Sequence, residues 1–475
     1  MKYFIIFSIV LFIPFILFAQ NHRINVPGDF TKIQDAINSS VDGDTILVAP
    51  GTYYENVNFK GKNILLSSHY FFNEDVSFIN TTIIDGSKPQ FSDTTSVALF
   101  LSGEKNTAIL QGFTITGGKG SRVRDQDINQ IVRSGGGILI DHASPTIRHN
   151  IIAYNNTTNS SGFAGGGGIA AHHSNAIISN NIIYKNNAED GGGVILGHSG
   201  VLFRNNVIAF NTTNPTHFGG GGVFVHGVQG KFINNTVVYN SSDKGGGIAT
   251  HDGDFPIVNI ENSIIYGNTT GSSNAQITGP GTFNITNTNI EGGWSGNGNV
   301  DENPLFIENT PLILQEGSPC VDRGDPNIVN NDWEDADNPG FALSPALGTL
   351  RNDMGAYGGN QYKSMPYSNV LITGVEDENK TTPNNIKLNQ NYPNPFNPTT
   401  TITYELPFTT NVVLTIYDVL GHEVRTLVNT HQLSGRQSVT WDGRNGHGTK
   451  VSSGVFIYRL QTENRIQTRK MILMK

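Results

Sequence analysis

The sequence contains very little cysteine and few charged residues. Cys320 is the single cysteine among 475 residues, so an intramolecular disulfide cannot stabilise the fold. Asp, Glu, Lys and Arg make up 15% of the chain, and the net charge is −9. A mildly acidic chain without a basic stripe cannot displace the counterions of a nucleic acid, which argues against nucleic acid as a partner.

Helix-forming patterns are also scarce, whereas turn-forming residues are abundant. Glycine alone accounts for 55 residues. In the repeated part of the chain, at about 135–270, the apolar runs are short, and none shows a 3.6-residue period over a helical length. This composition favours an all-β protein built from short strands and tight turns.

The N-terminus has the pattern of a signal peptide over residues 1–19. Lys2 precedes an apolar stretch at residues 4–18, and Ala19 offers a small residue for cleavage. The stretch is short for a membrane span and no cysteine follows it, so we expect neither a membrane anchor nor a lipid anchor. The pattern therefore predicts an exported protein.

Internal repeats indicate the architecture. A run of glycines followed by an aliphatic residue recurs every 25 to 31 residues. Each run is followed by a second shared phrase, of which NIIAYNN (150–156) and NIIYKNN (181–187) are examples. The aliphatic residues after the glycine runs are Ile138, Ile169, Val194, Val223 and Ile248.

A repeat of this length cannot bury its own apolar face, but stacked copies can, with strands pairing from coil to coil. Asparagine can extend such stacking, because its amide can pair between coils. We therefore expect a right-handed parallel β-helix over residues 20–360; a β-propeller is the rival, although its repeat is longer. An amphipathic helix with Phe30, Ile33 and Ile37 on one face would cover the first coil. The aperiodic segment 303–359 would form an irregular C-terminal cap.

Three phrases carry a family resemblance: DGDTILVAPGTYYENV (42–57), TIIDGS (82–87) and LQGFTITGG (110–118). With them, residues 24–360 resemble bacterial right-handed β-helix proteins of the pectin-lyase-like superfamily. The resemblance implies the fold but not the activity, because that superfamily spans lyases, hydrolases, epimerases and adhesins.

A change of composition separates a second domain. Residues 361–384 predict a linker, and alternating apolar residues over 385–475 predict a small antiparallel β-sandwich. The marks NYPNPFNP (391–398), Trp441-Asp442-Gly443 and SGVFIY (453–458) are similar to the type A sorting domain of the type IX secretion system. This resemblance implies export across the outer membrane, with the passenger released or attached to the surface, and the type IX machinery as a partner. A carbohydrate-binding Ig-like module is the alternative, and we expect a monomer.

Catalytic motifs of the superfamily are incomplete. Where pectate lyases carry Trp-Ile-Asp-His, this chain has Leu139-Ile140-Asp141-His142, and the Arg-x-Pro-x-x-Arg motif retains only Pro145 and Arg148. Polygalacturonase carboxylate patterns are missing, and the one Gly-His-Gly lies at 446–448 in the second domain. No catalytic residue is assigned; if the protein is an enzyme, a pectate-lyase-like polysaccharide lyase is expected.

Histidines recur near one height of successive coils. In a stacked β-helix they would form a row with neighbours one strand spacing apart. Two interpretations stay open, namely a stacked structural ladder and a row that chelates zinc or copper. The residues are His142, His173, His198, His226 and His251.

Three longer connections precede glycine runs and should project from one side of the solenoid. They offer Arg122, Arg124 and Arg133 for anions, and Phe163, His217 and Phe218 for stacking on sugars. Neutral insertion is the alternative. In the cap, the oxygen ligands of Asp332, Asp335 and Asp337 could bind Ca²⁺, or could simply be solvated.

Together these patterns predict an exported, cell-surface or released β-helix protein that binds polysaccharide through loops on one side. The alternatives are a lyase or hydrolase acting on an acidic polysaccharide, and a structural or adhesive surface protein.

Overall fold

The computed structural model divides the chain into two compact units, Met1–Gly374 and Val375–Lys475. It describes residues 22–474 except 126–129, 158–163, 215–218, 228, 252–254, 271–275, 308–309, 361–385, 392, 407–409, 433–434 and 463–464. The predicted signal peptide (1–19) and linker (361–384) lie outside the described residues. Among the helices that are described, none has the length and apolar character needed to span a membrane.

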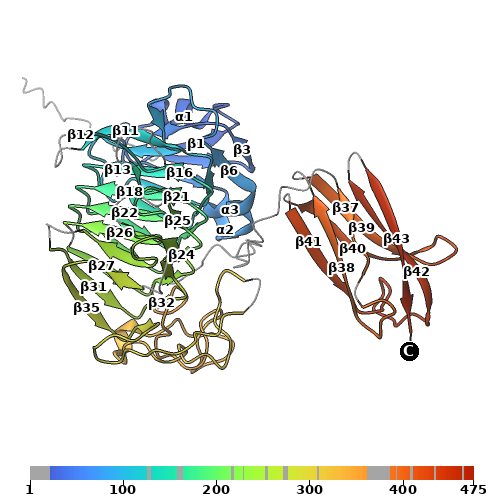
Figure 1. The fold of residues 1–475 in the computed structure, drawn as a ribbon. Coiled ribbons are helices and arrows are strands. Elements are labelled where there is room, and N and C mark those ends of the chain that lie inside the picture. Colours follow the sequence, from blue (N-terminus) through green and yellow to red (C-terminus); the bar gives the residue numbers. More distant parts are fainter. Residues whose placement is uncertain are drawn as a thin grey trace, which may run out of the picture. The chain divides into compact units, whose positions relative to one another are not determined.

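The first unit is a parallel β-solenoid in which each coil adds one strand to each of several sheets (Figure 1). Sheet I consists of β1 (Arg23–Val26), β2 (Thr45–Val48), β5 (Leu65–Ser68), β9 (Ile109–Gln111), β14 (Thr146–Arg148), β19 (Ile177–Ser179), β23 (Leu202–Arg204), β27 (Gln229–Ile233), β31 (Ile257–Glu261) and β35 (Thr282–Thr286). Sheet II consists of β3 (Gly51–Tyr53), β6 (Thr82–Asp85), β10 (Thr114–Thr116), β15 (Ile151–Ala153), β20 (Ile182–Tyr184), β24 (Val207–Ala209), β28 (Thr236–Val238), β32 (Ile264–Tyr266) and β36 (Asn289–Ile290).

Two further sheets complete the coils. Sheet III consists of β4 (Val57–Asn58), β8 (Ala98–Phe100), β13 (Ile138–Asp141), β18 (Ile169–His172), β22 (Val194–Gly197), β26 (Val223–His226), β30 (Ile248–Thr250) and β34 (Ile277–Thr278). Sheet IV consists of β16 (Asn156–Thr157), β21 (Asn187–Ala188), β25 (Thr212–Thr213), β29 (Ser241–Ser242) and β33 (Thr269–Thr270). A small side sheet joins β7 (Thr94–Thr95), β11 (Gly120–Asp125), β12 (Gln130–Ser134) and β17 (Ala164–Gly165).

The register confirms the repeat. Ile138 pairs with Ile169 in the next coil, Ile169 with Val194, Val194 with Val223, and Val223 with Ile248. The aliphatic residues after the glycine runs thus stack on one another and are buried in the core. The predicted all-β parallel solenoid is therefore confirmed.

Two ladders of asparagine lie inside the solenoid, at the corners on either side of sheet II. The amide of Asn186, for example, donates to the side-chain oxygen of Asn211 (3.0 Å) and to the carbonyl of Ile152 (2.8 Å). The amides of the two ladders thereby gain partners in the neighbouring coils, as burial of a polar group requires. One ladder contains Asn150, Asn181, Asn206 and Asn235, and the other contains Asn155, Asn186, Asn211, Asn240 and Asn268.

Helix α1 (Ile33–Ser39) packs beside the first strands. Ile33 and Ile37 are fully buried, and Phe30 packs against the same core. The carboxylate of Glu55 accepts the N–H groups of Ile33 (2.9 Å) and Gln34 (3.0 Å), which satisfies the exposed N-terminus of the helix. Two short helices, α2 (Tyr70–Asn73) and α3 (Ser77–Thr81), follow.

The irregular segment after β36 contains one turn of 3-10 helix, η1 (Ile328–Asn330), and lies at the C-terminal end of the solenoid (Figure 1). It does more than close that end. Leu312, Met354 and Tyr357 pack against the outward side chains of sheet II. The side chain of Asn234 also donates to the carbonyl of Asp353 (2.9 Å). The segment therefore covers part of one flank of the solenoid.

The second unit consists of two antiparallel sheets around a separate core, as predicted. One sheet contains β37 (Lys387–Leu388), β38 (Thr400–Leu406) and β41 (Gly435–Trp441), and the other contains β39 (Thr410–Tyr417), β40 (Glu423–Gln432), β42 (Gly454–Thr462) and β43 (Ile466–Leu473). Trp441, Tyr404 and Tyr458 are its largest buried side chains.

Candidate functional site

The corner that follows the strands of sheet III gathers most of the predicted histidines. His142, His173 and His198 follow β13, β18 and β22 directly, and each adopts a left-handed backbone with φ of 51°, 49° and 45°. Gly227 has the same conformation (φ 60°) after β26. Such a conformation is uncommon for a residue with a Cβ atom. We call these histidines, together with Asp141, His172 and His226 at the strand ends, the histidine corner.

The structure resolves the predicted row into two adjacent rows. Asp141 pairs with His172, His172 with Gly197, and Gly197 with His226, so these residues form the row at the strand ends. His142, His173 and His198 form the second row, one residue further along. His251 follows Thr250, which pairs with Val225, and therefore belongs to the first row.

Ring contacts connect the two rows. His142 stacks on His173 with centroids 4.4 Å apart, and His173 stacks on His198 at 5.5 Å. His198 meets His226 edge to face at 5.2 Å, and His226 lies 6.0 Å from His172.

Two glycines make room for these rings. A Cβ atom at Gly197 would lie 2.4 Å from the His226 ring and 2.7 Å from the His172 ring. A Cβ atom at Gly227 would lie 2.4 Å from the His198 ring. Any other residue at either position would force an imidazole to move, so the glycines and the histidines fit together.

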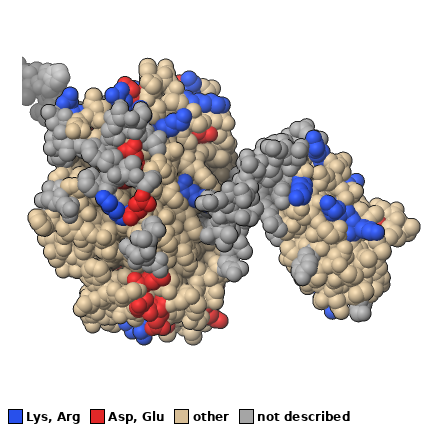
Figure 2. All heavy atoms as spheres, viewed as in Figure 1, with Lys and Arg blue, Asp and Glu red and all other residues tan. Residues whose placement is uncertain are grey.

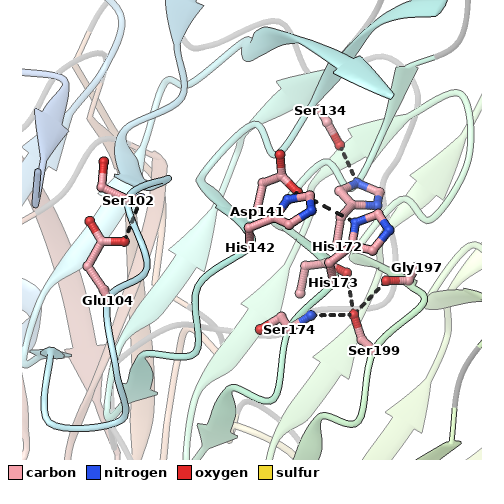
Figure 3. A network of polar contacts seen from close by, with 11 residues as sticks. Ser102, Glu104, Ser134, Asp141, His142, His172, His173, Ser174, Gly197 and Ser199 are labelled. Atoms are coloured by element: carbon pink, nitrogen blue, oxygen red, sulfur yellow. Dashed lines mark hydrogen bonds and ion pairs between the residues drawn. The ribbon is translucent and has the colours of Figure 1, made fainter. Parts of the chain in front are cut away.

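Asp141 lies beside the stacked rings of His142 and His173 (Figure 3). Its Oδ1 atom is 2.8 Å from Nδ1 of His142 and 3.7 Å from Nδ1 of His173. One ligand atom from each of the three residues lies within 4.8 Å of the others. Ser134, at the end of β12, contacts Nε2 of His172 at 3.1 Å. The corner thus brings imidazoles, a carboxylate and a hydroxyl together at a partly exposed surface.

The predicted arginines lie on strands β11 and β12, which pair with each other. Arg133 donates to the hydroxyl of Thr95 (2.9 Å) and to the carbonyl of Gly120 (2.6 Å), which ties these strands to β7. Arg122 lies 3.6 Å from the carboxylate of Asp93. Arg124 is exposed on the same strand. Phe163, His217 and Phe218, predicted for stacking on sugars, lie outside the described residues.

The predicted calcium ligands have separate surroundings. Asp332 is buried and accepts the backbone N–H of Asp353, whereas Asp335 accepts the N–H of Asp337 (3.0 Å) in a surface turn. Among the described residues, only Asp141, His142 and His173 group three metal-binding side chains within 4.8 Å. Calcium binding by Asp332, Asp335 and Asp337 stays a prediction.

A pair of buried carboxylates in the cap was not foreseen. Burial raises the pKa of Asp332, and the nearby carboxylate of Asp353 raises it further. Burial also raises the pKa of Asp353, which accepts the N–H groups of Asp322 (2.7 Å) and Leu347 (2.8 Å). The two residues are far apart in sequence, so spacing alone could not have indicated the pair.

An aromatic column, also missed from the sequence, lies at the corner between sheets II and IV. Tyr154, Phe210 and Tyr239 occupy equivalent left-handed positions, with φ near 55°. Tyr154 is 57% exposed and Tyr239 is 38% exposed, and Phe210 stacks on Tyr239 at 5.2 Å. Lys185 fills the coil between Tyr154 and Phe210, with Nζ 5.9 Å from the Tyr154 ring centre. The fifth residue of the shared phrase NIIAYNN and its counterparts could have indicated this column.

A polar row runs beside the aromatic column on sheet IV. Asn156 pairs with Asn187, and Asn187 with Thr212, in successive coils. The amide of Asn187 donates to the hydroxyl of Thr212 at 2.8 Å. Figure 2 shows that uncharged residues dominate the visible face of the solenoid.

Comparison with known proteins identifies part of the second unit. The FlgD Ig-like domain family matches residues 395–465, so this unit carries a domain of that kind. Comparison with curated protein sequences finds no match.

Solved structures match over short segments. PorZ, described as an essential bacterial surface component of the type IX secretion system of Porphyromonas gingivalis, is 20% identical over 18% of this chain and 11% of its own, with a TM-score of 0.15. Latent PorU from the same bacterium is 22% identical over 19% of this chain and 9% of its own, with a TM-score of 0.17. FlgD from P. aeruginosa is 27% identical over 16% of this chain and 58% of its own, with a TM-score of 0.14. The chain thus spans about a tenth of PorZ and of PorU.

Proposed function

We propose that this protein is an exported surface protein whose solenoid binds a polysaccharide along the aromatic column and its polar row. The observation that carries the proposal is the repetition of Tyr154, Phe210 and Tyr239 at one corner of the coils, where the rings of Tyr154 and Tyr239 are exposed and that of Phe210 is partly buried. Aromatic side chains with one wet face offer apolar area without a large entropy cost on binding. Such rings suit the apolar faces of sugars.

The spacing of the coils fits an extended polymer. Equivalent residues in neighbouring coils are about 4.8 Å apart, which is close to the length of one sugar residue. The amide of Asn187 and the hydroxyl of Thr212 lie in the neighbouring row and can exchange hydrogen bonds with sugar hydroxyls. A polysaccharide lying along the solenoid axis would therefore meet the same groups repeatedly.

Export by the type IX system is proposed from the second unit. Its sequence marks resemble the type A sorting domain, and the same residues stabilise the Ig-like fold. Asn391 donates its backbone N–H to the hydroxyl of Tyr458 (2.9 Å), and this hydroxyl donates to the carbonyl of Asn389 (2.8 Å). Trp441 is buried against Phe396 and Phe456.

A lyase is the weaker candidate. The arginine of the partial lyase motif, Arg148, donates Nε to the side chain of Gln111 at 2.8 Å. The guanidinium of Arg133 donates to the carbonyl of Gly120 and so stabilises the pairing of β11 and β12. Both guanidiniums therefore hold hydrogen bonds within the fold, and neither is free to act as the base that uronate chemistry requires.

Affinity electrophoresis of the full chain in gels containing neutral or acidic polysaccharides tests the binding proposal. The substitutions Tyr154→Asn and Tyr239→Asn remove two rings, and asparagine tolerates the left-handed backbone. We expect the double variant to bind about tenfold more weakly, a change of about 1.4 kcal/mol. Tyr54→Asn is the control, because Tyr54 is 50% exposed but lies outside the column.

Equal retardation of the double variant and the parent would contradict binding at the column. Formation of unsaturated products when the protein is incubated with an acidic polysaccharide would instead support the lyase function. Export is tested separately by deleting residues 385–475 in a host with a type IX system, where we expect the passenger to remain inside the outer membrane.

A further inference from the structure

We propose that Asp141, His142 and His173 form a binding site for a divalent transition-metal cation such as Zn²⁺. This site is distinct from the aromatic column, because it lies at the corner after sheet III rather than at the corner before sheet IV. It does not depend on the function proposed above.

The chemistry of the donors selects the class of cation. Two imidazole nitrogens and one carboxylate oxygen suit Zn²⁺ and its neighbours, whereas Ca²⁺ and Mg²⁺ require mostly oxygen ligands. Ligand atoms of a tetrahedral zinc ion with bonds of about 2.0–2.1 Å lie about 3.3 Å apart. The distances from Oδ1 of Asp141 to the two Nδ1 atoms, 2.8 and 3.7 Å, lie on either side of that value.

The three side chains remain reachable from solvent. The side chain of His142 is 47% exposed, and those of His173 and Asp141 are 30% and 25% exposed. Nδ1 of His173 is itself buried, so this ring must turn toward the solvent to bind a cation through that atom. Three protein ligands leave a fourth position for water or for an added ligand, as in zinc sites that are not purely structural.

The backbone fixes the starting positions of the two imidazoles. His142 and His173 have left-handed backbones, a conformation that the corner after sheet I also has at His149, Asn180, Asn205 and Asn234. This conformation is therefore a feature of the solenoid corners and not of the metal site alone. The parallel coils place the rings of His142 and His173 in a stack with centroids 4.4 Å apart. Because a metal ion lies in the plane of each imidazole that binds it, one of the rings must turn about its side-chain bonds to share an ion with the other.

Zinc titration of the full chain tests the site. The tag-free protein, stripped of metal, would compete with a chromophoric chelator for Zn²⁺. We expect one zinc ion per chain for the parent. His142→Asn and His173→Asn keep the left-handed backbone acceptable, and each should weaken binding at least about tenfold.

His198→Asn is the matched control, since it makes the same change at the same position of the next coil. His198 lies outside the group that contains Asp141, so we expect this variant to bind zinc within about threefold of the parent. Thermal unfolding without metal establishes that all variants are folded. Absence of stoichiometric zinc binding by the parent overturns the proposal. Equal binding by His173→Asn and the parent, or an equal loss in His198→Asn, also overturns it.

Discussion

The asparagine ladders and the histidine corner both repeat once per coil, yet they differ in how their polar atoms are used. Each buried amide, such as that of Asn211, accepts from one neighbouring coil and donates to the other. The imidazoles of His142, His173 and His198 instead stack face to face, and they are partly exposed. Repetition is therefore compatible with two roles. Saturated, buried hydrogen bonds indicate cohesion between coils, and partly exposed imidazoles beside a carboxylate indicate a place for a ligand.

The largest effect is expected from the asparagine side of this comparison. The side-chain oxygen of Asn211 accepts hydrogen bonds from the backbone N–H and the side-chain amide of Asn186. Its amide donates to the carbonyl of Ile183 and to the side-chain oxygen of Asn240. Asn211→Ala removes all of these bonds. Leaving these buried groups unsatisfied should lower the free energy of unfolding of the solenoid by about 3–5 kcal/mol. Thermal or urea unfolding of the full chain, followed by far-UV circular dichroism, measures the loss.

The control for this variant is Asn187→Ala in the neighbouring polar row. The Asn187 side chain is half-buried, and its bond to Thr212 can be replaced by water. We expect a loss below about 1 kcal/mol. Equal losses for the two variants would show that the buried ladder contributes no more than a surface row.

A second prediction concerns the fit between glycine and histidine at the corner. Gly227→Ala places a methyl group 2.4 Å from the His198 ring and also imposes the cost of a left-handed backbone. We expect a loss of about 2 kcal/mol in unfolding free energy. In a His198→Asn background the clash is relieved, so the same substitution should cost about half as much. A double-mutant cycle with additive losses would contradict the described contact.

The fold could be predicted from the sequence because the solenoid is a one-dimensional repeat. The glycine runs and the Asn-containing phrases recur once per coil and show where each coil begins. The sequence also placed the histidines on successive coils, and counting from the aliphatic residue puts His142, His173 and His198 four residues on but His226 and His251 three residues on. The count alone did not show that this offset of one residue forms two separate rows. His142 and His172 belong to different rows because a strand residue and a corner residue face different directions. The aromatic column was hidden because Lys185 and Gly267 interrupt it at the same position. The pairing of Asp332 with Asp353 depends on a cap without periodicity.

That carboxylate pair predicts how stability depends on pH. Burial raises the pKa of Asp332 and of Asp353 above 3.8 in the folded protein, so the folded state binds more protons than the unfolded chain. The contribution of this pair to the free energy of unfolding is therefore largest below pH 3.8. It decreases as the pH rises from 3.8 through the raised pKa values of the folded state. Asp332→Asn keeps an acceptor for the N–H of Gly359 and removes one of the two charges.

We expect Asp332→Asn to flatten the pH dependence and to increase the free energy of unfolding at pH 8 by about 1 kcal/mol. Unfolding midpoints measured from pH 5 to 8 provide the test. Asp337→Asn is the control, because Asp337 is exposed and should leave the slope unchanged. A steeper slope in Asp332→Asn would contradict the sign of the raised pKa.

The smallest change in unfolding free energy is expected for His198→Asn. This variant tests directly whether the histidine corner differs from the asparagine ladders in its contribution to stability. The substitution removes a stacking contact at 5.5 Å with His173 and an edge contact at 5.2 Å with His226. It also replaces histidine by a residue that accepts φ near 45° more readily, as Asn180 does in the corner after sheet I (φ 54°). These two effects oppose each other, so the unfolding free energy should change by no more than about 0.5 kcal/mol. His198→Ala loses the same contacts without the backbone benefit and should be about 1 kcal/mol less stable than His198→Asn. If His198→Asn lowered the free energy of unfolding by more than about 2 kcal/mol, the histidines would stabilise the stacking of the coils, as the asparagine ladders do.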